Sequence, residues 1–213
     1  KKEAQIILIQ KNRKESLKFI VSEFKKVREP NDKMIFDLAN FYKRSKDYKK
    51  AIKYYSKIIE NLSENSEVKS DLLYRRGGSY ERNGDYFNAD KDLLESLNIN
   101  PDDAYVLNYL AYSWLERDYK IDEAMEMLKT AYAAESDDPY IIDSIGWAYY
   151  LINDYTEAEK YLKRAVEMMP DDPIVNDHYG DVLWENGNRI QARYYWNYVL
   201  NLEDTEEDLK NNI

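Results

Sequence analysis

Residues 142–165 read IDSIGWAYYLINDYTEAEKYLKRA, and this stretch decides the fold. Two small residues, Gly146 and Ala158, each lie in a segment whose large apolar residues recur at helical spacing. Between the segments, Asp154 is followed three residues later by Glu157, the pattern of a capping box that opens a second helix. The stretch therefore predicts two antiparallel helices whose backbones approach closely at the small residues.

Both small positions recur along the chain. The second recurs at gaps of 38, 35, 34 and 34 residues, at Ala51, Ala89, Ala124, Ala158 and Ala192. The first recurs at gaps of 38, 34, 35 and 34 residues, at Ala39, Gly77, Ala111, Gly146 and Gly180. A period of about 34 residues is the signature of an array of helical hairpins. Because such arrays present extended binding surfaces, the period favours a binding function.

Prolines and glycines support the same register. Asp138 and Asp172 each precede a proline, so they are predicted N-caps with proline in the first turn. Gly84 and Gly187 fall in the turns inside units. All five prolines fall between units, at Pro30, Pro101, Pro139, Pro170 and Pro173.

These units resemble tetratricopeptide repeats (TPRs). The resemblance covers roughly residues 32–206, and a weaker copy precedes it, with Ala4 and Ser16 in the small positions and Ile20 in a large one. It implies an all-α fold, a right-handed superhelical solenoid of antiparallel helix pairs. The expected division is a partial repeat at 1–31, repeats at 32–69, 70–103, 104–138, 139–172 and 173–206, and the start of a C-terminal helix or tail at 207–213. Thr205 and Asp208 are expected to open that helix.

Two gaps are longer than the others. The 38-residue gap places four extra residues around Asn61–Lys69, as a polar loop or an extended second helix. The 35-residue gap places one extra residue near Arg117–Lys120. Insertions in repeat arrays usually map to loops, so we expect both to be tolerated there.

The resemblance also implies that the first helix of each repeat lines a concave binding face. The residues of these helices that do not occupy core positions are mostly aromatic or acidic. Those assigned to partner binding are Tyr74, Asn108, Tyr109, Tyr112, Asp143, Trp147, Tyr150, Asp177, Asp181 and Trp184. Aromatic rings supply large rigid contact area, and Asn and Asp orient hydrogen bonds. The competing interpretation is that the tyrosines only pack between units.

The same positions predict the chemistry of the partner. An acidic face favours a protein or peptide segment that is basic or neutral and carries apolar anchors. The TPR clamp for C-terminal carboxylates needs Lys, Asn and Arg at face positions. Phe36, Tyr105 and Tyr109 occupy such slots, and only Asn40 and Arg75 fit, so a chaperone-tail clamp is not expected.

Charge is distributed unevenly along the chain. Residues 1–60 hold 17 Lys and Arg against 8 Asp and Glu, although the whole chain has a net charge of −10. Nucleic acid is not an expected partner, because the acidic remainder would repel phosphate. The basic segment suits an anionic membrane surface or an acidic protein, or its lysines merely solvate exposed helix faces. The sequence has no apolar run long enough to span a membrane.

Sites for catalysis and metals have little support. The chain has no cysteine, and His178 is its only histidine, which excludes zinc sites built from several soft ligands. Asp177, Asp181 and Glu185 share one helix face beside His178, so Asp177, His178 and Asp181 are weak candidates for a hard cation. An acidic wall that attracts Lys or Arg of a partner is the favoured interpretation. No phosphate loop, dinucleotide fingerprint or nucleophile elbow is present, and we expect neither a cofactor nor an enzyme.

Three segments are more distinctive than a generic repeat, the ones around Leu107, Asp143 and Asn176. They are similar to the C-terminal repeats of a bacterial TPR group that includes exported proteins and outer-membrane lipoproteins. That resemblance implies a scaffold or adaptor in the periplasm or anchored to a membrane, with the cytoplasm as the alternative. The predicted function is non-enzymatic binding of a partner segment in an aromatic, acidic groove. The alternative is an assembly module that stacks with itself or with neighbouring repeats.

Overall fold

The computed structural model describes residues 13–63, 66–203 and 205–213. Within these ranges every regular element is a helix, and the helices fall into two compact units, the first ending at Pro101 and the second beginning at Asp102. The first unit contains α2 (Arg13–Lys26), α3 (Asp32–Arg44), α4 (Tyr48–Ile59), α5 (Glu67–Arg82) and α6 (Tyr86–Ile99). The second contains α7 (Ala104–Leu115), α8 (Ile121–Ala134), α9 (Pro139–Leu151), α10 (Tyr155–Met168), α11 (Pro173–Glu185), α12 (Arg189–Asn201) and α13 (Glu207–Lys210).

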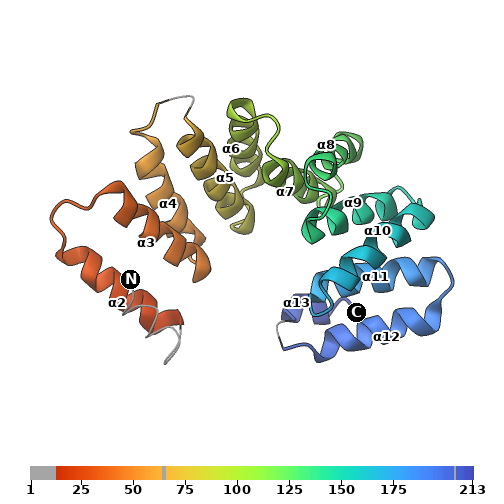
Figure 1. Ribbon diagram of the computed structural model, residues 1–213. Helices are drawn as coiled ribbons and strands as arrows, with labels where there is room; N and C mark the ends of the chain where they lie inside the picture. Colours follow the sequence, from red (N-terminus) through yellow and green to blue (C-terminus); the bar gives the residue numbers. More distant parts are fainter. Residues whose placement is uncertain (1–12, 64–65, 204) are drawn as a thin grey trace. The chain divides into compact units, whose positions relative to one another are not determined.

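Consecutive helices form antiparallel pairs that are joined by short turns (Figure 1). The pairs are α3–α4 and α5–α6 in the first unit, and α7–α8, α9–α10 and α11–α12 in the second. Within a unit, the second helix of one pair packs on the first helix of the next. This arrangement confirms the all-α hairpin array that the sequence predicts.

The small residues lie where the two helices of a pair cross. Ala51, Ala89, Ala124, Ala158 and Ala192 are fully buried. A Cβ added at Gly77 would lie 2.9 Å from Cγ of Leu93, and one added at Gly146 would lie 2.8 Å from Cγ of Leu162. These distances are shorter than carbon atoms tolerate, so glycine permits a helix contact that alanine would push apart. The two helices therefore meet in one register.

Each unit has its own apolar core. In the first unit the core includes the fully buried Tyr55 and Leu73, with Ile20 of α2 packed against its edge. In the second it includes Leu162 and Val182. Burial of such side chains contributes about 1.5–3 kcal/mol each, so packing of the repeats stabilises helices that are individually short.

The turn inside each pair usually has three residues, of which the middle one is left-handed. That middle residue is Gly84 or Gly187 in two pairs, with φ of 77° and 84°. Lys46 and Asn153 occupy it in two others, with φ of 58° and 63°. Sequence reasoning placed the two glycines in turns, and the structure adds that the position itself requires positive φ.

The α7–α8 turn is longer and confirms the position of the one-residue insertion. Its residues run from Glu116 to Lys120, and both Asp118 and Lys120 have positive φ. Tyr119 donates its backbone N–H to the carbonyl of Trp114. In the first pair the equivalent bond runs from the backbone N–H of the N-cap residue Asp47 to the carbonyl of Tyr42. The added residue therefore leaves Lys120 as the N-cap of α8, without a side-chain cap.

Aspartates cap most of the other helices. Asp138 and Asp172 accept hydrogen bonds from the first-turn backbone of α9 and α11, as predicted. Asp154 accepts from the backbone N–H of Glu157, which confirms half of the predicted capping box. The carboxylate of Glu157 pairs with Lys160 instead of turning back to Asp154.

Three boundaries differ from expectation. Helix α4 ends at Ile59 and α5 begins at Glu67, so the first long gap does not extend the second helix, and part of it adds a turn at the start of α5. Helix α13 begins at Glu207, and its N-cap residue is Glu206, whose side chain makes no capping hydrogen bond. Thr205 therefore does not open this helix, and its hydroxyl donates to the carbonyl of Val199. In the weak N-terminal copy, Ala4 and the Ser16 side chain lie outside the described residues. The division of the chain into repeats stays a prediction.

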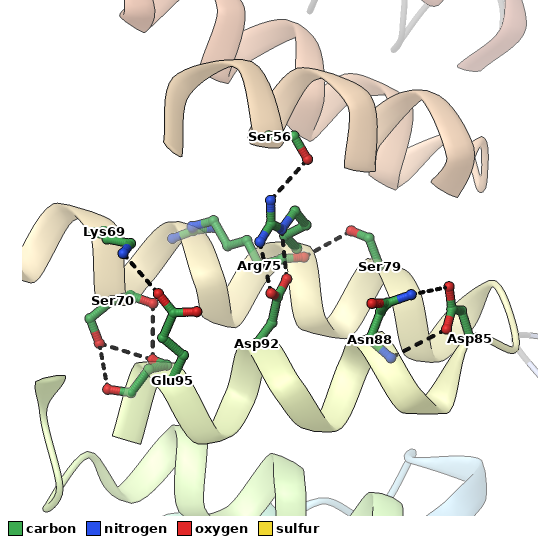
Figure 2. Close-up of polar contacts among 11 residues, drawn as sticks. Ser56, Lys69, Ser70, Arg75, Ser79, Asp85, Asn88, Asp92 and Glu95 are labelled. Atoms are coloured by element: carbon green, nitrogen blue, oxygen red, sulfur yellow. Dashed lines mark hydrogen bonds and ion pairs between the residues drawn. The ribbon is translucent and has the colours of Figure 1, made fainter. Parts of the chain in front are cut away.

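An ion pair between a half-buried arginine and a buried aspartate joins two helices of the first unit, and the arginine also contacts a third (Figure 2). Arg76 of α5 donates from Nε and Nη2 to the two oxygens of Asp92 on α6, at 2.6 and 2.7 Å. Its Nη1 donates to Oγ of Ser56 on α4, at 3.0 Å. One guanidinium therefore fixes the register of α4, α5 and α6.

Candidate functional site

The candidate site is built on the first helices of the second unit. Helix α9 contacts both α7 and α11, so their exposed faces adjoin. The ring of Trp147 lies against His178 at a centroid distance of 4.0 Å and an angle of 10°. On the same ring, Tyr150 stacks at 4.7 Å and 8°. We call this the Trp147 stack (Tyr150, Trp147 and His178); it joins α9 to α11.

A buried polar contact holds the imidazole of the stack. Nδ1 of His178 lies 3.1 Å from both carboxylate oxygens of Asp143, and both residues are buried. Burial lowers the pKa of His178, but the charge and hydrogen bond of Asp143, with the charges of Glu116 and Asp177, outweigh it and raise the pKa above its ordinary value. The pair therefore fixes the ring orientation and favours the protonated imidazole.

Hydrogen bonds also fix the indoles on this face. Nε1 of Trp147 donates to the carboxylate of Glu116 at 3.1 Å, and Nε1 of Trp196 donates to Asp181 at 3.1 Å. A Cβ added at Gly180 would lie 2.6 Å from Nε1 of Trp196. The glycine thus provides the space that lets this indole reach the acidic face.

Beside the stack, Asp177 is a carboxylate in an unfavourable environment. No described residue donates a hydrogen bond to it or forms an ion pair with it. Burial, together with the negative charge of Asp181, raises the pKa of Asp177 to about 6. Burial and the charges of Asp181, Glu185 and Asp177 raise the pKa of Tyr150 to about 12. This part of the face would be stabilised by a cation.

The last tryptophan of the set faces cations of its own chain. The guanidinium carbons of Arg189 and Arg193 lie 4.9 and 5.7 Å from the ring centroid of Trp184. The same ring lies 5.4 Å from that of Trp196. Trp184 therefore already makes the cation–π contacts that a basic partner would offer.

Most predicted residues of the second unit share this face, but their exposures differ. Trp147, Tyr150, Asp177, Asp181 and Trp184 are half-buried and reach the surface. The ring centroid of Tyr112 lies 6.3 Å from that of His178. Asn108 and Tyr109, both half-buried, lie on the same helix as Tyr112, α7. Asp143 does not offer itself to a partner, because it is buried against His178. Tyr74 is half-buried on α5 of the first unit, away from this set in the sequence.

A metal centre receives no support. Across the described ranges, no group of three or more His, Cys, Asp or Glu is arranged to hold a metal ion. The weak candidates Asp177, His178 and Asp181 have separate environments, since His178 faces Asp143 and Asp181 accepts from Trp196.

Sequence reasoning missed two residues of the face. Glu116 lies in the lengthened turn, where no pattern gives it a direction. Trp196 occupies a core position that leucine fills at Leu93 and Leu162. The replacement of that leucine by tryptophan opposite a glycine was a usable signal.

The sequence model of the tetratricopeptide repeat family matches residues 2–205. This chain belongs to the tetratricopeptide repeat family. A curated relative, a TPR repeat-containing protein of Pseudomonas aeruginosa, is 35% identical over 111 residues, which are 52% of this chain and 19% of the relative. The bimA protein of Emericella nidulans is 29% identical over 85 residues, 40% of this chain and 10% of that protein. The TPR chain thus spans less than a fifth of these relatives.

Solved structures resemble the TPR chain in fold. A tetratricopeptide repeat protein of Parabacteroides merdae has a TM-score of 0.72 at 14% identity, covering 98% of this chain and 80% of that one. PilW, described as a type IV pilus biogenesis factor, has a TM-score of 0.70 at 20% identity, covering 83% and 79%. MamA of Desulfovibrio magneticus has a TM-score of 0.65 at 18% identity, covering 85% and 99%. No helix in the described part of the TPR chain could cross a membrane.

Proposed function

We propose that this TPR protein is a non-enzymatic scaffold that binds a segment of another protein on the face of its second unit. The observation that carries the proposal is the Trp147 stack, an aromatic surface whose His178 and Trp147 rings are oriented by contacts with Asp143 and Glu116. Rigid aromatic surface gives contact area at a small entropic cost. An exported location, by resemblance to the bacterial group, stays a prediction.

The charges beside the stack indicate the partner's chemistry. Among the described residues, none forms an ion pair with Asp177, and burial raises its pKa although the charge of His178 opposes the shift. Asp181 adds a second carboxylate whose pKa is also raised, chiefly by burial. A Lys or Arg of the partner would neutralise this pair while its apolar neighbour lies on Trp147 or Tyr150. The preferred partner is therefore a basic segment with apolar anchors.

The test is an anisotropy titration with a short fluorescent peptide of Lys, Leu and Ser. We expect Trp147→Ala to weaken binding by about ten-fold or more, as for an interface hot spot. Asp181→Lys should weaken it through repulsion. Tyr140→Ala and Glu123→Gln, exposed residues of α9 and α8, are the matched controls. Unchanged affinity in both test variants would place the site elsewhere.

Self-association is a second candidate, and exposed residues of α12 favour it. Ile190 is 88% exposed and Tyr194 67% exposed. At the Tyr194 position the other second helices carry Lys53, Lys91, Glu126 and Lys160. An exposed apolar pair that includes a tyrosine where the other repeats are charged suits a contact with a second copy. Light scattering of the wild type and of Tyr194→Lys tests this, and a monomer at high concentration in both would rule it out.

A further inference from the structure

The first unit has a face of opposite charge to the site of the second. It is formed by the exposed sides of α3 and α5, and we call it the cationic face (Phe36, Asn40, Lys43 and Arg75). Arg75 of α5 lies over the ring of Phe36 on α3, with its guanidinium carbon 5.3 Å from the ring centroid. This contact places the two first helices side by side, so that their residues form one surface.

The aromatic base of the face is fixed from below. Phe36 meets the ring of Tyr55 at 6.4 Å and 60°, and the Tyr55 hydroxyl donates to Oδ1 of Asn40 at 2.7 Å. Tyr55 is fully buried on α4. Two helices, α3 and α4, therefore hold the platform, and the guanidinium from α5 lies on top of it.

Arg75 keeps hydrogen-bonding capacity for a partner. Its Nε donates to both oxygens of Asp71, at 3.0 and 2.8 Å. Among the described contacts, this pairing uses neither of its terminal nitrogens. The guanidinium is oriented by Asp71 and Phe36, yet its outer edge still presents N–H donors suited to a carboxylate.

Lys43 is a second cation, and among the described residues no carboxylate forms an ion pair with it. Its side chain is half-buried, and no described residue accepts a hydrogen bond from its amine. Burial and the positive charges of Arg75 and Arg82 lower its pKa, opposed only by Asp71. A cation held partly desolvated beside like charges is more stable when an anion joins it.

We propose that the cationic face binds an acidic segment of a partner protein, with a carboxylate side chain received between Lys43 and Arg75. Charge complementarity selects this occupant, since a basic segment would be repelled by the same groups. This surface is independent of the site on the second unit, which suits a basic segment. One chain would thus hold partners of opposite charge.

The probe is a short fluorescent peptide of Glu, Leu and Ser, titrated by anisotropy against the whole chain at low and moderate salt. Lys43→Gln and Arg75→Gln should each weaken binding about ten-fold, the usual effect of losing one charge-assisted hydrogen bond. Lys53→Gln is the matched control, because it removes an equal charge from an exposed position of α4; it should change affinity less than about two-fold.

Two further measurements keep the result interpretable. Lys43→Gln should leave the melting temperature unchanged or raise it, because a desolvated cation is lost, so weaker binding cannot be ascribed to unfolding. Trp147→Ala should leave the affinity for the acidic peptide unchanged, which separates this site from the one on the second unit. Equal losses in Lys43→Gln and Lys53→Gln, or no binding of the acidic peptide, would overturn the proposal.

Discussion

Single residues decide the turns of this protein through their backbone angles. Gly84 and Lys46 hold the same left-handed position in successive pairs, but only glycine adopts it without a steric cost. The two glycines, Gly84 and Gly187, mark this turn position in the sequence. The sequence does not mark Lys46 or Asn153 as left-handed, because the surrounding hydrogen bonds impose that conformation there.

Lys46→Gly should therefore raise the free energy of unfolding by about 0.5–1 kcal/mol. Gly84→Ala should lower it by about 1 kcal/mol, and since nothing lies within 4 Å of the added Cβ, the cost is one of conformation alone. Urea unfolding measures both. Lys49→Gly, inside α4, is the control and should destabilise the helix. Opposite signs for Lys46→Gly and Gly84→Ala are the expected result, and equal signs would contradict it.

The imidazole of His178 shows what sequence reasoning at the residue scale cannot reach. Its identity was noted, but its partner Asp143 lies 35 positions away on another helix. The pairing depends on how α9 and α11 are rotated against each other, which side-chain packing sets. The periodicity predicted which helix faces meet, not which atoms.

Because His178 is the only histidine, NMR can follow it without ambiguity. We expect its pKa to exceed the ordinary value of about 6.5 in the wild type. In Asp143→Asn the pKa should fall below that value, because burial then acts without the strongest opposing charge. A wild-type pKa at or below 6.5 would contradict the assigned contact.

The same shift links pH to stability. A histidine whose pKa is raised in the folded state stabilises the fold fully below its unfolded pKa. That stabilisation is lost as pH rises from about 6.5 through the folded pKa. Urea unfolding of the wild type and of His178→Gln should therefore differ most at pH 6 and less at pH 9. The raised pKa of Asp177 has the same effect over a lower pH window: the free energy of unfolding falls as pH rises from its ordinary pKa of 3.8 to about 6.

At the scale of elements, the Arg76–Asp92 pair shows how three helices share one interaction. Burial raises the pKa of Asp92 even though the charge of Arg76 opposes it, whereas the hydrogen bond and charge of Asp92 raise the pKa of Arg76 in spite of burial. The ion pair thus offsets the desolvation of the guanidinium but not that of the carboxylate. Its role is then to specify register more than to add stability. Arg76 precedes the small residue Gly77 in the repeat, but no sequence pattern shows which acid it would meet.

Asp92→Ala should lower the free energy of unfolding by about 3 kcal/mol, because it leaves the half-buried guanidinium of Arg76 without its carboxylate. The double variant Arg76→Met with Asp92→Leu should recover most of that loss. Ser56→Ala should cost only about 1 kcal/mol. Chemical unfolding of the set gives the coupling energy, and a double variant as unstable as Asp92→Ala would argue for a strongly favourable ion pair.

At the scale of the whole molecule, stability is distributed through neighbouring contacts. Helix α9 packs against four helices, α7, α8, α10 and α11, whereas α12 has extensive contacts only with α11. Repeat arrays lose structure first where neighbours are fewest. The hairpin array followed from a period of about 34 residues, but the separation into two compact units did not, because no linker composition marks Pro101–Asp102.

Hydrogen exchange should therefore be faster in α2 and α12 than in α9 and α10. Val199 is a fully buried residue of α12, so Val199→Ala should accelerate exchange in α11 and α12 and leave α3 to α6 unaffected. Mass spectrometry of peptic fragments resolves these segments. Uniform acceleration along the chain would mean that the molecule opens as one cooperative body.

The stack of Trp147 on His178 also gives the protein an optical signal of its own. An excited indole in contact with a protonated imidazole loses its emission by electron transfer, and these two rings lie 4.0 Å apart. Fluorescence should therefore dim as the solution is acidified through the pKa of His178, and this dimming should be absent in Trp147→Phe. A ligand that covers the ring would shift that titration, so binding could be followed in the unlabelled protein by light alone.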